Sequence, residues 1–98
     1  MTPGDGEAKP RLVFFFAPSS GTCRRTEGHL AQALQRRHNH DTFRLVRVNV
    51  EERPDLAQRL RVDEVPTLVV VDGRRVARRI VSPRGCRELE RELAEWLR

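Results

Sequence analysis

The apolar positions along the chain predict four β-strands. They are residues 11–17, 43–50, 68–71 and 75–81. The first is a continuous apolar run, which is typical of a strand that is covered on both faces, while the second alternates apolar and polar side chains. Asp72-Gly73 joins the last two and favours a hairpin, because glycine accepts the positive φ of such a turn. We expect the returning strand at the sheet edge, where its arginines would discourage pairing with another chain.

Three further segments have the apolar spacing of helices. Residues 23–37 place one set of side chains on a common face: Cys23, Thr26, Leu30, Ala33 and Leu34. A short helix begins at Pro54, since proline is favoured at the first helical position. Residues 82–97 form the last helix, with Ser82 as its N-cap and Pro83 at its first position. Its apolar face consists of Cys86, Leu89, Leu93, Trp96 and Leu97.

The elements follow one another in the order β-α-β-α-β-β-α. The first two strands are joined through a helix, so they must run parallel with a right-handed crossover, whereas the hairpin makes the last two antiparallel. We therefore expect an α/β fold, a four-stranded mixed sheet with helices on both faces. The length of 98 residues fits one domain. We place this domain at residues 11–98 and expect residues 1–10 to be a flexible leader.

Composition narrows the classes of function. With 38% apolar and 34% charged residues, the chain has the balance of an ordinary globular protein. No apolar run reaches the roughly 20 residues that span a membrane. The first ten residues lack the basic start and apolar stretch of a signal peptide, and the two cysteines are too few for a disulfide scaffold. We therefore expect a cytoplasmic protein without a membrane segment.

The net charge of +5 raises nucleic-acid binding as an alternative. Almost all of the basic residues are arginines, since Lys9 is the only lysine. They are scattered in pairs such as Arg24-Arg25 and do not form a recognition helix, and few aromatic side chains remain for base stacking. We favour solvated surface charge over a nucleic-acid site.

Metal, phosphate and disulfide sites find little support in the sequence. His38 and His40 lack the additional cysteine or carboxylate that would complete a tetrahedral metal site, and Gly21 stands alone, without a phosphate-binding glycine loop. Cys86 could pair with Cys23, but its place on an apolar helix face favours burial. We therefore expect no metal and no cofactor.

Three segments resemble the active-site region of the thioredoxin family. Residues 15–24, Phe-Phe-Ala-Pro-Ser-Ser-Gly-Thr-Cys-Arg, are similar to the family's strand, Ala-x-Trp-Cys-Gly-Pro-Cys-Lys motif and helix. Residues 48–51, Val-Asn-Val-Glu, resemble the end of its second core strand, and residues 61–68, which contain Val-Pro-Thr, resemble the segment that ends at its cis-proline. The resemblance covers residues 11–97. It implies a minimal thioredoxin domain without the family's extra N-terminal strand and helix.

The same resemblance indicates which chemistry has changed. Ser20 stands where the family has its attacking cysteine, which gives Ser-Gly-Thr-Cys in place of Cys-Gly-Pro-Cys. Disulfide exchange needs a thiolate, and a serine hydroxyl cannot form the mixed disulfide, so we expect Ser20 to cap the following helix instead. Phe14 falls where the family has a buried aspartate that moves protons, and Arg47 where it has a lysine. A phenyl ring cannot act as a base. We therefore expect no dithiol–disulfide exchange.

A binding surface is implied at the motif loop (residues 19–23) and the proline segment (residues 65–67), together with the Ser82-Pro83 loop. Its candidate residues are Ser19, Ser20, Gly21, Thr22, Val65, Pro66 and Thr67. In the family the bond before the matching proline is cis and exposes backbone beside the motif, where a partner peptide could pair as an added strand. The alternative is that Pro66 only shapes the turn into the third strand. We expect a protein or peptide partner.

Cys23 matches the family's second cysteine, and we expect it to be a small buried core thiol. The alternative is an enzyme that exchanges thiols with Cys23 as its one catalytic residue, although monothiol relatives keep the first cysteine of the motif. A fainter resemblance, in the Ala-Pro-Ser-Ser-Gly loop and residues 53–57, is to the circadian-clock KaiB proteins, which act by binding. The sequence predicts a redox-silent binding module, with a monothiol enzyme and a KaiB-like interaction protein as alternatives.

Overall fold

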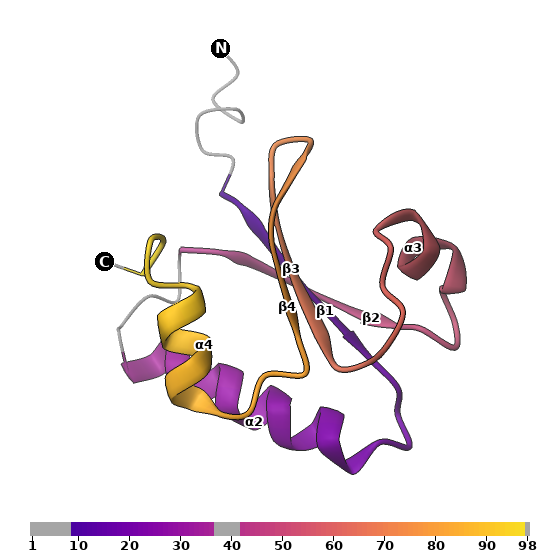
Figure 1. Cartoon of the computed structure of the whole chain (residues 1–98), viewed down its shortest axis with the longest axis horizontal. Helices are drawn as coiled ribbons and strands as arrows, with labels where there is room; N and C mark the ends of the chain where they lie inside the picture. The colour runs from indigo at the N-terminus through magenta and orange to yellow at the C-terminus, as the bar shows by residue number, and fades with distance from the viewer. Residues whose placement is uncertain (1–8, 37–41, 98) are drawn as a thin grey trace.

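The computed structural model describes residues 9–36 and 42–97, and the predicted elements lie within them in the predicted order (Figure 1). The strands are β1 (Arg11–Phe16), β2 (Arg44–Asn49), β3 (Thr67–Asp72) and β4 (Arg75–Val81). The helices are α2 (Gly21–Arg36), α3 (Pro54–Arg59) and α4 (Cys86–Glu92). Most of the predicted leader, residues 1–8, and both His38 and His40 lie outside the described residues.

The strands form the predicted four-stranded mixed sheet in the order β2-β1-β3-β4. β1 runs parallel to β2, with Leu12 opposite Leu45, and antiparallel to β3, with Phe15 opposite Thr67. β3 and β4 form the expected antiparallel hairpin, whose Gly73 has a φ of 66°. Because β1 lies inside the sheet, its continuous apolar run is buried on both faces, as predicted.

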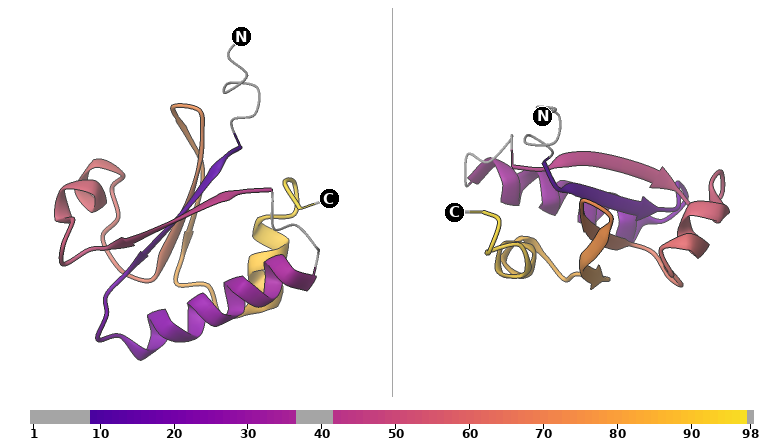
Figure 2. Two further views of the ribbon diagram at one scale, coloured as in Figure 1. Left: turned by 180° about the vertical axis from the view of Figure 1, so that it is seen from behind. Right: turned by 90° about the horizontal axis from the view of Figure 1, so that it is seen from above.

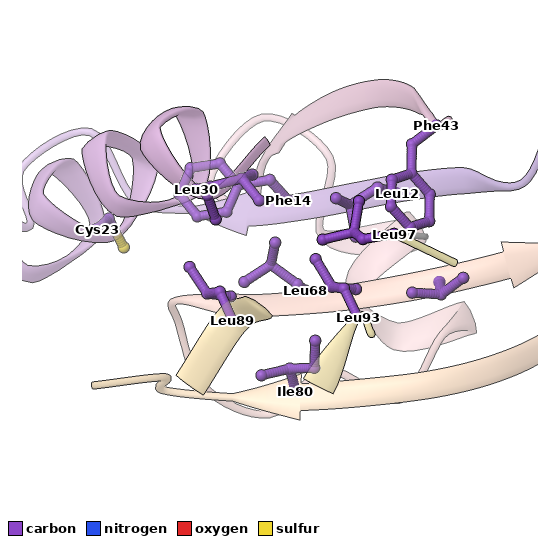
Figure 3. Close-up of a cluster of buried hydrophobic side chains, with 12 residues drawn as sticks. Leu12, Phe14, Cys23, Leu30, Phe43, Leu68, Ile80, Leu89, Leu93 and Leu97 are labelled. Atoms are coloured by element: carbon purple, nitrogen blue, oxygen red, sulfur yellow. The ribbon is translucent and has the colours of Figure 1, made fainter. Parts of the chain in front are cut away.

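Helices cover the two faces of the sheet unequally. α2 and α4 lie against each other on one face, and α3 lies on the other (Figures 1 and 2). The larger core is between the sheet and the helix pair, where Phe14 and Leu68 of the sheet meet Leu30 of α2 and Leu89 of α4 (Figure 3). The smaller core packs Phe15 and other β-residues against α3. The helical faces predicted for α2 and α4 are therefore the buried ones.

The arginines of the edge strand β4 do more than face the solvent. Arg78 forms ion pairs with Glu92 and Glu95, at 3.1 and 3.3 Å, and its guanidinium lies 5.7 Å from the ring centre of Trp96. Arg79 donates a hydrogen bond to the carbonyl oxygen of Leu60, at 2.8 Å. These side chains connect the edge strand to the elements on either face of the sheet.

The last helix was predicted too long at both ends, since α4 ends at Glu92 and not at residue 97. α4 begins at Cys86 with Gly85 as its N-cap, so Ser82 does not cap it. Ser82 instead ends the hairpin: it has a φ of 46°, and its N–H donates to the carbonyl oxygen of Pro66, at 2.9 Å. A carboxylate serves the helix start in its place, because the Glu88 side chain accepts the N–H of Arg84, at 2.9 Å.

Candidate functional site

The motif loop follows the C-terminal end of β1 and contains the first turn of α2. The Ser20 Oγ accepts the N–H of Cys23, at 3.1 Å, and the Ser20 carbonyl accepts the N–H of Arg24, at 3.2 Å. This is the geometry of an N-cap residue, whose side chain satisfies an amide that has no partner within the helix. The predicted cap is confirmed, and with it α2 begins at Gly21, two residues before the predicted start.

The proline segment lies beside the motif loop because of the strand register. β1 and β3 are antiparallel and Phe15 faces Thr67, so the start of β3 adjoins the end of β1. The Val65–Pro66 peptide bond is cis. The Thr67 hydroxyl donates to the Glu64 carbonyl oxygen, at 2.7 Å, across the turn that precedes β3.

The side chains of Ser82 and Glu64 brace this segment; Ser82 was predicted as a helix cap, and Glu64 was not singled out from the sequence. The Ser82 hydroxyl donates to Oε2 of Glu64, at 3.1 Å, while the Ser82 N–H is bonded to Pro66. Ser82 is exposed and has a positive φ, which costs a residue other than glycine about 1 kcal/mol or more. The sequence carried no signal for this pairing, because it joins residues 18 positions apart.

The predicted surface residues divide into exposed and buried groups. Ser19, Gly21 and Thr22 are exposed, and Ser20 and Val65 are half-buried. Pro66 and Thr67 are buried, and Thr67 is only 1% exposed. The side chains within reach of a partner therefore belong mainly to the motif loop, and in the proline segment Val65 is the residue that is partly exposed.

Cys23 lies at the border of the larger core. Its side chain is 3% exposed, and Figure 3 shows its sulfur at one end of the cluster that contains Phe14 and Leu30. Phe14 is 1% exposed, and its ring stacks on that of Phe16 with the ring centres 5.7 Å apart. The expected buried thiol is present, and its surroundings are aromatic and aliphatic.

A pocket of about 230 Å³ opens beside Cys23, between β1, the first turns of α2 and β2. Its apolar wall is formed by Phe14, Phe16, Ala17, Pro18 and Cys23. Its polar rim is formed by Ser20, Arg24, Glu27 and Arg47. We call it the aromatic pocket. Within the described part of the chain, no residue of the proline segment lines it.

Glu27 and Arg47 form a fixed ion pair on the rim of the aromatic pocket. Glu27 accepts two bonds from one guanidinium, at 2.6 Å from Nε and 3.1 Å from Nη2 of Arg47. The same guanidinium lies 4.6 Å from the ring centre of Phe16. Glu27 was not among the predicted site residues, although its position four residues after Cys23 places both on one side of α2.

The other candidates from the sequence, a disulfide, a metal site and a membrane segment, find no support in the described residues. Neither Cys23 nor Cys86 forms a disulfide, and the half-buried Cys86 donates from Sγ to Oε2 of Glu90, at 3.2 Å. No group of three or more His, Cys, Asp or Glu side chains that could hold a metal occurs in residues 9–36 and 42–97. Over the same residues, no helix is long and apolar enough to cross a membrane.

Comparison with known proteins identifies the group to which this architecture belongs. The family model described as Thioredoxin matches residues 5–95. The chain belongs to the thioredoxin family. It is similar to thioredoxin of Mycolicibacterium smegmatis, with 29% identity over 92 residues that cover 94% of this chain and 82% of that protein. It is also 29% identical over 87 residues to the bifunctional thioredoxin reductase/thioredoxin of Mycobacterium leprae, and the match covers 89% of this chain but only 19% of that protein.

Solved structures place the chain in the thioredoxin-like fold. Reduced desulfothioredoxin from Desulfovibrio vulgaris Hildenborough superposes with a TM-score of 0.76 and 28% identity, over 89% of this chain and 81% of that one. Mitochondrial thioredoxin 3 from Saccharomyces cerevisiae gives a TM-score of 0.68 over 88% of this chain. This member of the thioredoxin family therefore has the family's fold, with Ser-Gly-Thr-Cys at residues 20–23, Phe14 in the core and the Arg47–Glu27 pair on the rim of the aromatic pocket.

Proposed function

We propose that this member of the thioredoxin family is a binding module without dithiol–disulfide exchange, which holds a protein or peptide partner at its motif loop. The hydrogen bond from the Cys23 N–H to the Ser20 Oγ carries the proposal. It gives Ser20 a structural role at the position where thiol chemistry needs a nucleophile. The Ser20 hydroxyl therefore contributes to the stability of α2 without taking part in thiolate chemistry.

The chemistry of exchange supports the same conclusion. In that reaction a thiolate attacks one sulfur of a disulfide, a new sulfur–sulfur bond forms, and the other sulfur leaves as a thiolate. The Ser20 oxygen cannot replace sulfur in this step. The buried Phe14 offers no carboxylate to take the proton of Cys23, and Cys86 is bonded to Glu90 of its own helix. Both steps of a two-thiol cycle therefore lack a required atom at the expected position.

The exposure of the motif loop favours binding there. Ser19, Gly21 and Thr22 are exposed at the end of the sheet, beside the half-buried Val65. The hydrogen bonds of Ser20, Thr67 and Ser82 hold the two segments in place before a partner arrives. A preformed surface loses less conformational freedom on binding, which favours affinity. Binding of this kind requires no cofactor. The cytoplasmic location of the protein stays a prediction.

A reductase assay tests the loss of exchange activity. We expect the wild-type chain to reduce the disulfides of insulin in the presence of dithiothreitol no faster than dithiothreitol alone. Ser20→Cys restores a two-thiol motif and should raise the rate above that of the wild type. Ser19→Cys, which adds a thiol one position away, is the matched control and should not. Acceleration by the wild-type chain would contradict the proposal.

The monothiol alternative is favoured by one observation: Cys23 lines the aromatic pocket as well as the core. Alkylation with iodoacetamide in a Cys86→Ser background separates the two readings. Since Cys23 is 3% exposed, we expect labelling by mass spectrometry only after unfolding in urea. Complete labelling of the native protein within minutes would favour an enzyme that uses Cys23.

A further inference from the structure

We propose that the aromatic pocket receives one aromatic side chain of the partner peptide, and that acidic residues next to it bind Arg24 on the rim and the adjacent Arg25. This inference rests on the proposed function, since it names the chemistry of the partner that the motif loop would hold. It is carried by the size of the pocket, its apolar wall and the charge of its rim.

The volume of the aromatic pocket sets the size of the occupant. At about 230 Å³ it is several times larger than the roughly 30 Å³ that one water molecule occupies in the liquid. It is smaller than the pockets of about 300–1,000 Å³ that hold cofactors and drug-sized ligands. One large side chain matches this volume, whereas a whole cofactor does not.

The wall of the aromatic pocket favours an aromatic ring over an aliphatic or polar group. The ring of the half-buried Phe16 stacks on that of Phe14, which is only 1% exposed, with an interplanar angle of 16°, and Ala17, Pro18 and Cys23 complete the apolar wall. Aromatic rings pair with one another in offset or edge-to-face arrangements beyond what burial of area provides. A polar side chain would lose its hydrogen bonds to water against this wall.

The rim determines the charge of the neighbouring residues. Glu27 is neutralised by its two bonds to Arg47, so it leaves no free negative charge at the mouth of the pocket. Arg24 is exposed, lines the pocket and has no ion-pair partner among the described residues. Arg25 is exposed in the next position, and its one bonding partner among the described residues is the neutral hydroxyl of Thr22. The mouth therefore carries excess positive charge, which attracts acidic residues and repels basic ones.

The position of the aromatic pocket connects it to the motif loop. Ser20 lines the pocket and caps the first turn of α2, while its neighbours Ser19 and Gly21 face the solvent. A peptide that lies across the motif loop can therefore place one side chain in the pocket. The Glu27–Arg47 pair is already fixed over Phe16, so no rearrangement of the rim is needed to accept it.

Peptide selection tests this inference and the proposed function separately. Random 12-residue peptides displayed on phage are selected on the immobilised full-length chain, and the affinities of the enriched peptides are measured by fluorescence anisotropy. We expect the enriched peptides to share one Phe, Tyr or Trp next to Asp or Glu. Replacing that aromatic residue with alanine, or the acidic residues with lysine, should weaken binding at least tenfold.

Three variants and one control assign the binding site. Ala17→Leu narrows the aromatic pocket and Arg24→Glu reverses its charge, and each should weaken binding at least tenfold. Ser19→Gln enlarges a side chain of the motif loop outside the pocket without changing its charge and should also weaken binding. Arg87→Glu makes the same charge change at an exposed site on α4 and should leave binding within twofold. Circular dichroism and urea unfolding establish that each variant is folded, and Arg24→Glu alters only an exposed side chain.

The outcomes distinguish the two proposals. Peptides that lack the aromatic–acidic pair, or that depend on Ser19 but not on Ala17 and Arg24, would overturn this inference and leave the proposed function standing. A failure to enrich any peptide over an unrelated folded protein would overturn both. Loss of binding in Ala17→Leu and Arg24→Glu, with Arg87→Glu unchanged, would support both.

Discussion

The motif loop and the proline segment lie at the same end of the sheet, and in each of them a side-chain oxygen bonds to a backbone group. Ser20 accepts a backbone N–H in the motif loop, and Thr67 donates to a backbone carbonyl at the proline segment. Their surroundings differ. The proline segment is bonded to the end of β4 through Ser82 and is mostly buried, whereas the motif loop borders a pocket and is mostly exposed.

This difference shows that a turn places weaker demands on its side chains than disulfide exchange does. A turn needs only a donor or acceptor at the right place, and many side chains supply one. Disulfide exchange needs sulfur and a proton acceptor at fixed positions, and serine and phenylalanine supply neither. Under the proposed function, the backbone and polar contacts around the motif loop persist although Ser20 and Phe14 lack the atoms that disulfide exchange requires. Substitutions of single side chains at the motif loop and at the proline segment test this explanation.

The largest effect is expected when the family's carboxylate is restored beneath the motif loop. Phe14→Asp should lower the free energy of unfolding by about 4 kcal/mol, because it removes a ring that fills the core and buries a carboxylate among apolar side chains. Urea unfolding measures the change. Phe14→Leu is the control and should cost about 1.5 kcal/mol or less. If Phe14→Asp cost no more than Phe14→Leu, the site would still accept the family's aspartate.

Much of the fold could be predicted from the sequence, because burial imposes a period on each element. The alternation and helical spacing located each strand and helix of residues 9–36 and 42–97, and the Asp72-Gly73 hairpin and the parallel first pair followed from local rules. Errors occurred at the ends of helices. α2 starts before its first buried residue, since Ser20 and the amides of the first turn define its start, and these carry no apolar signal.

The polar contacts of the site could not be predicted in the same way. Glu27 and Arg47 are 20 residues apart, and their pairing depends on how α2 crosses β2. Ser82 has the pattern of a helix cap, with a proline directly after it, yet the bond of its N–H to Pro66 fixes a positive φ instead. Pairings between elements depend on their packing, which a period along the chain does not specify.

An intermediate effect is expected on the proline side. Thr67→Val keeps the shape of the side chain but removes the donor to the Glu64 carbonyl, so it should lower the free energy of unfolding by about 1.5 kcal/mol. Thr22→Val, at an exposed position, is the matched control and should change it by less than about 0.5 kcal/mol. Equal, small changes in both variants would show that the strand pairing alone holds the proline segment.

The smallest effect is expected at Ser20 itself. Ser20→Ala leaves the Cys23 amide without its cap and should lower the free energy of unfolding by about 1 kcal/mol, as measured by urea unfolding. Ser19→Ala, at the exposed neighbouring position, should change it by less than about 0.5 kcal/mol. Ser20→Asp, which retains an acceptor and adds a negative charge at the start of α2, should keep the stability of the wild type. If Ser20→Ala were as stable as the wild type, serine would have no structural role in the motif loop, and the main support for a binding module would be lost.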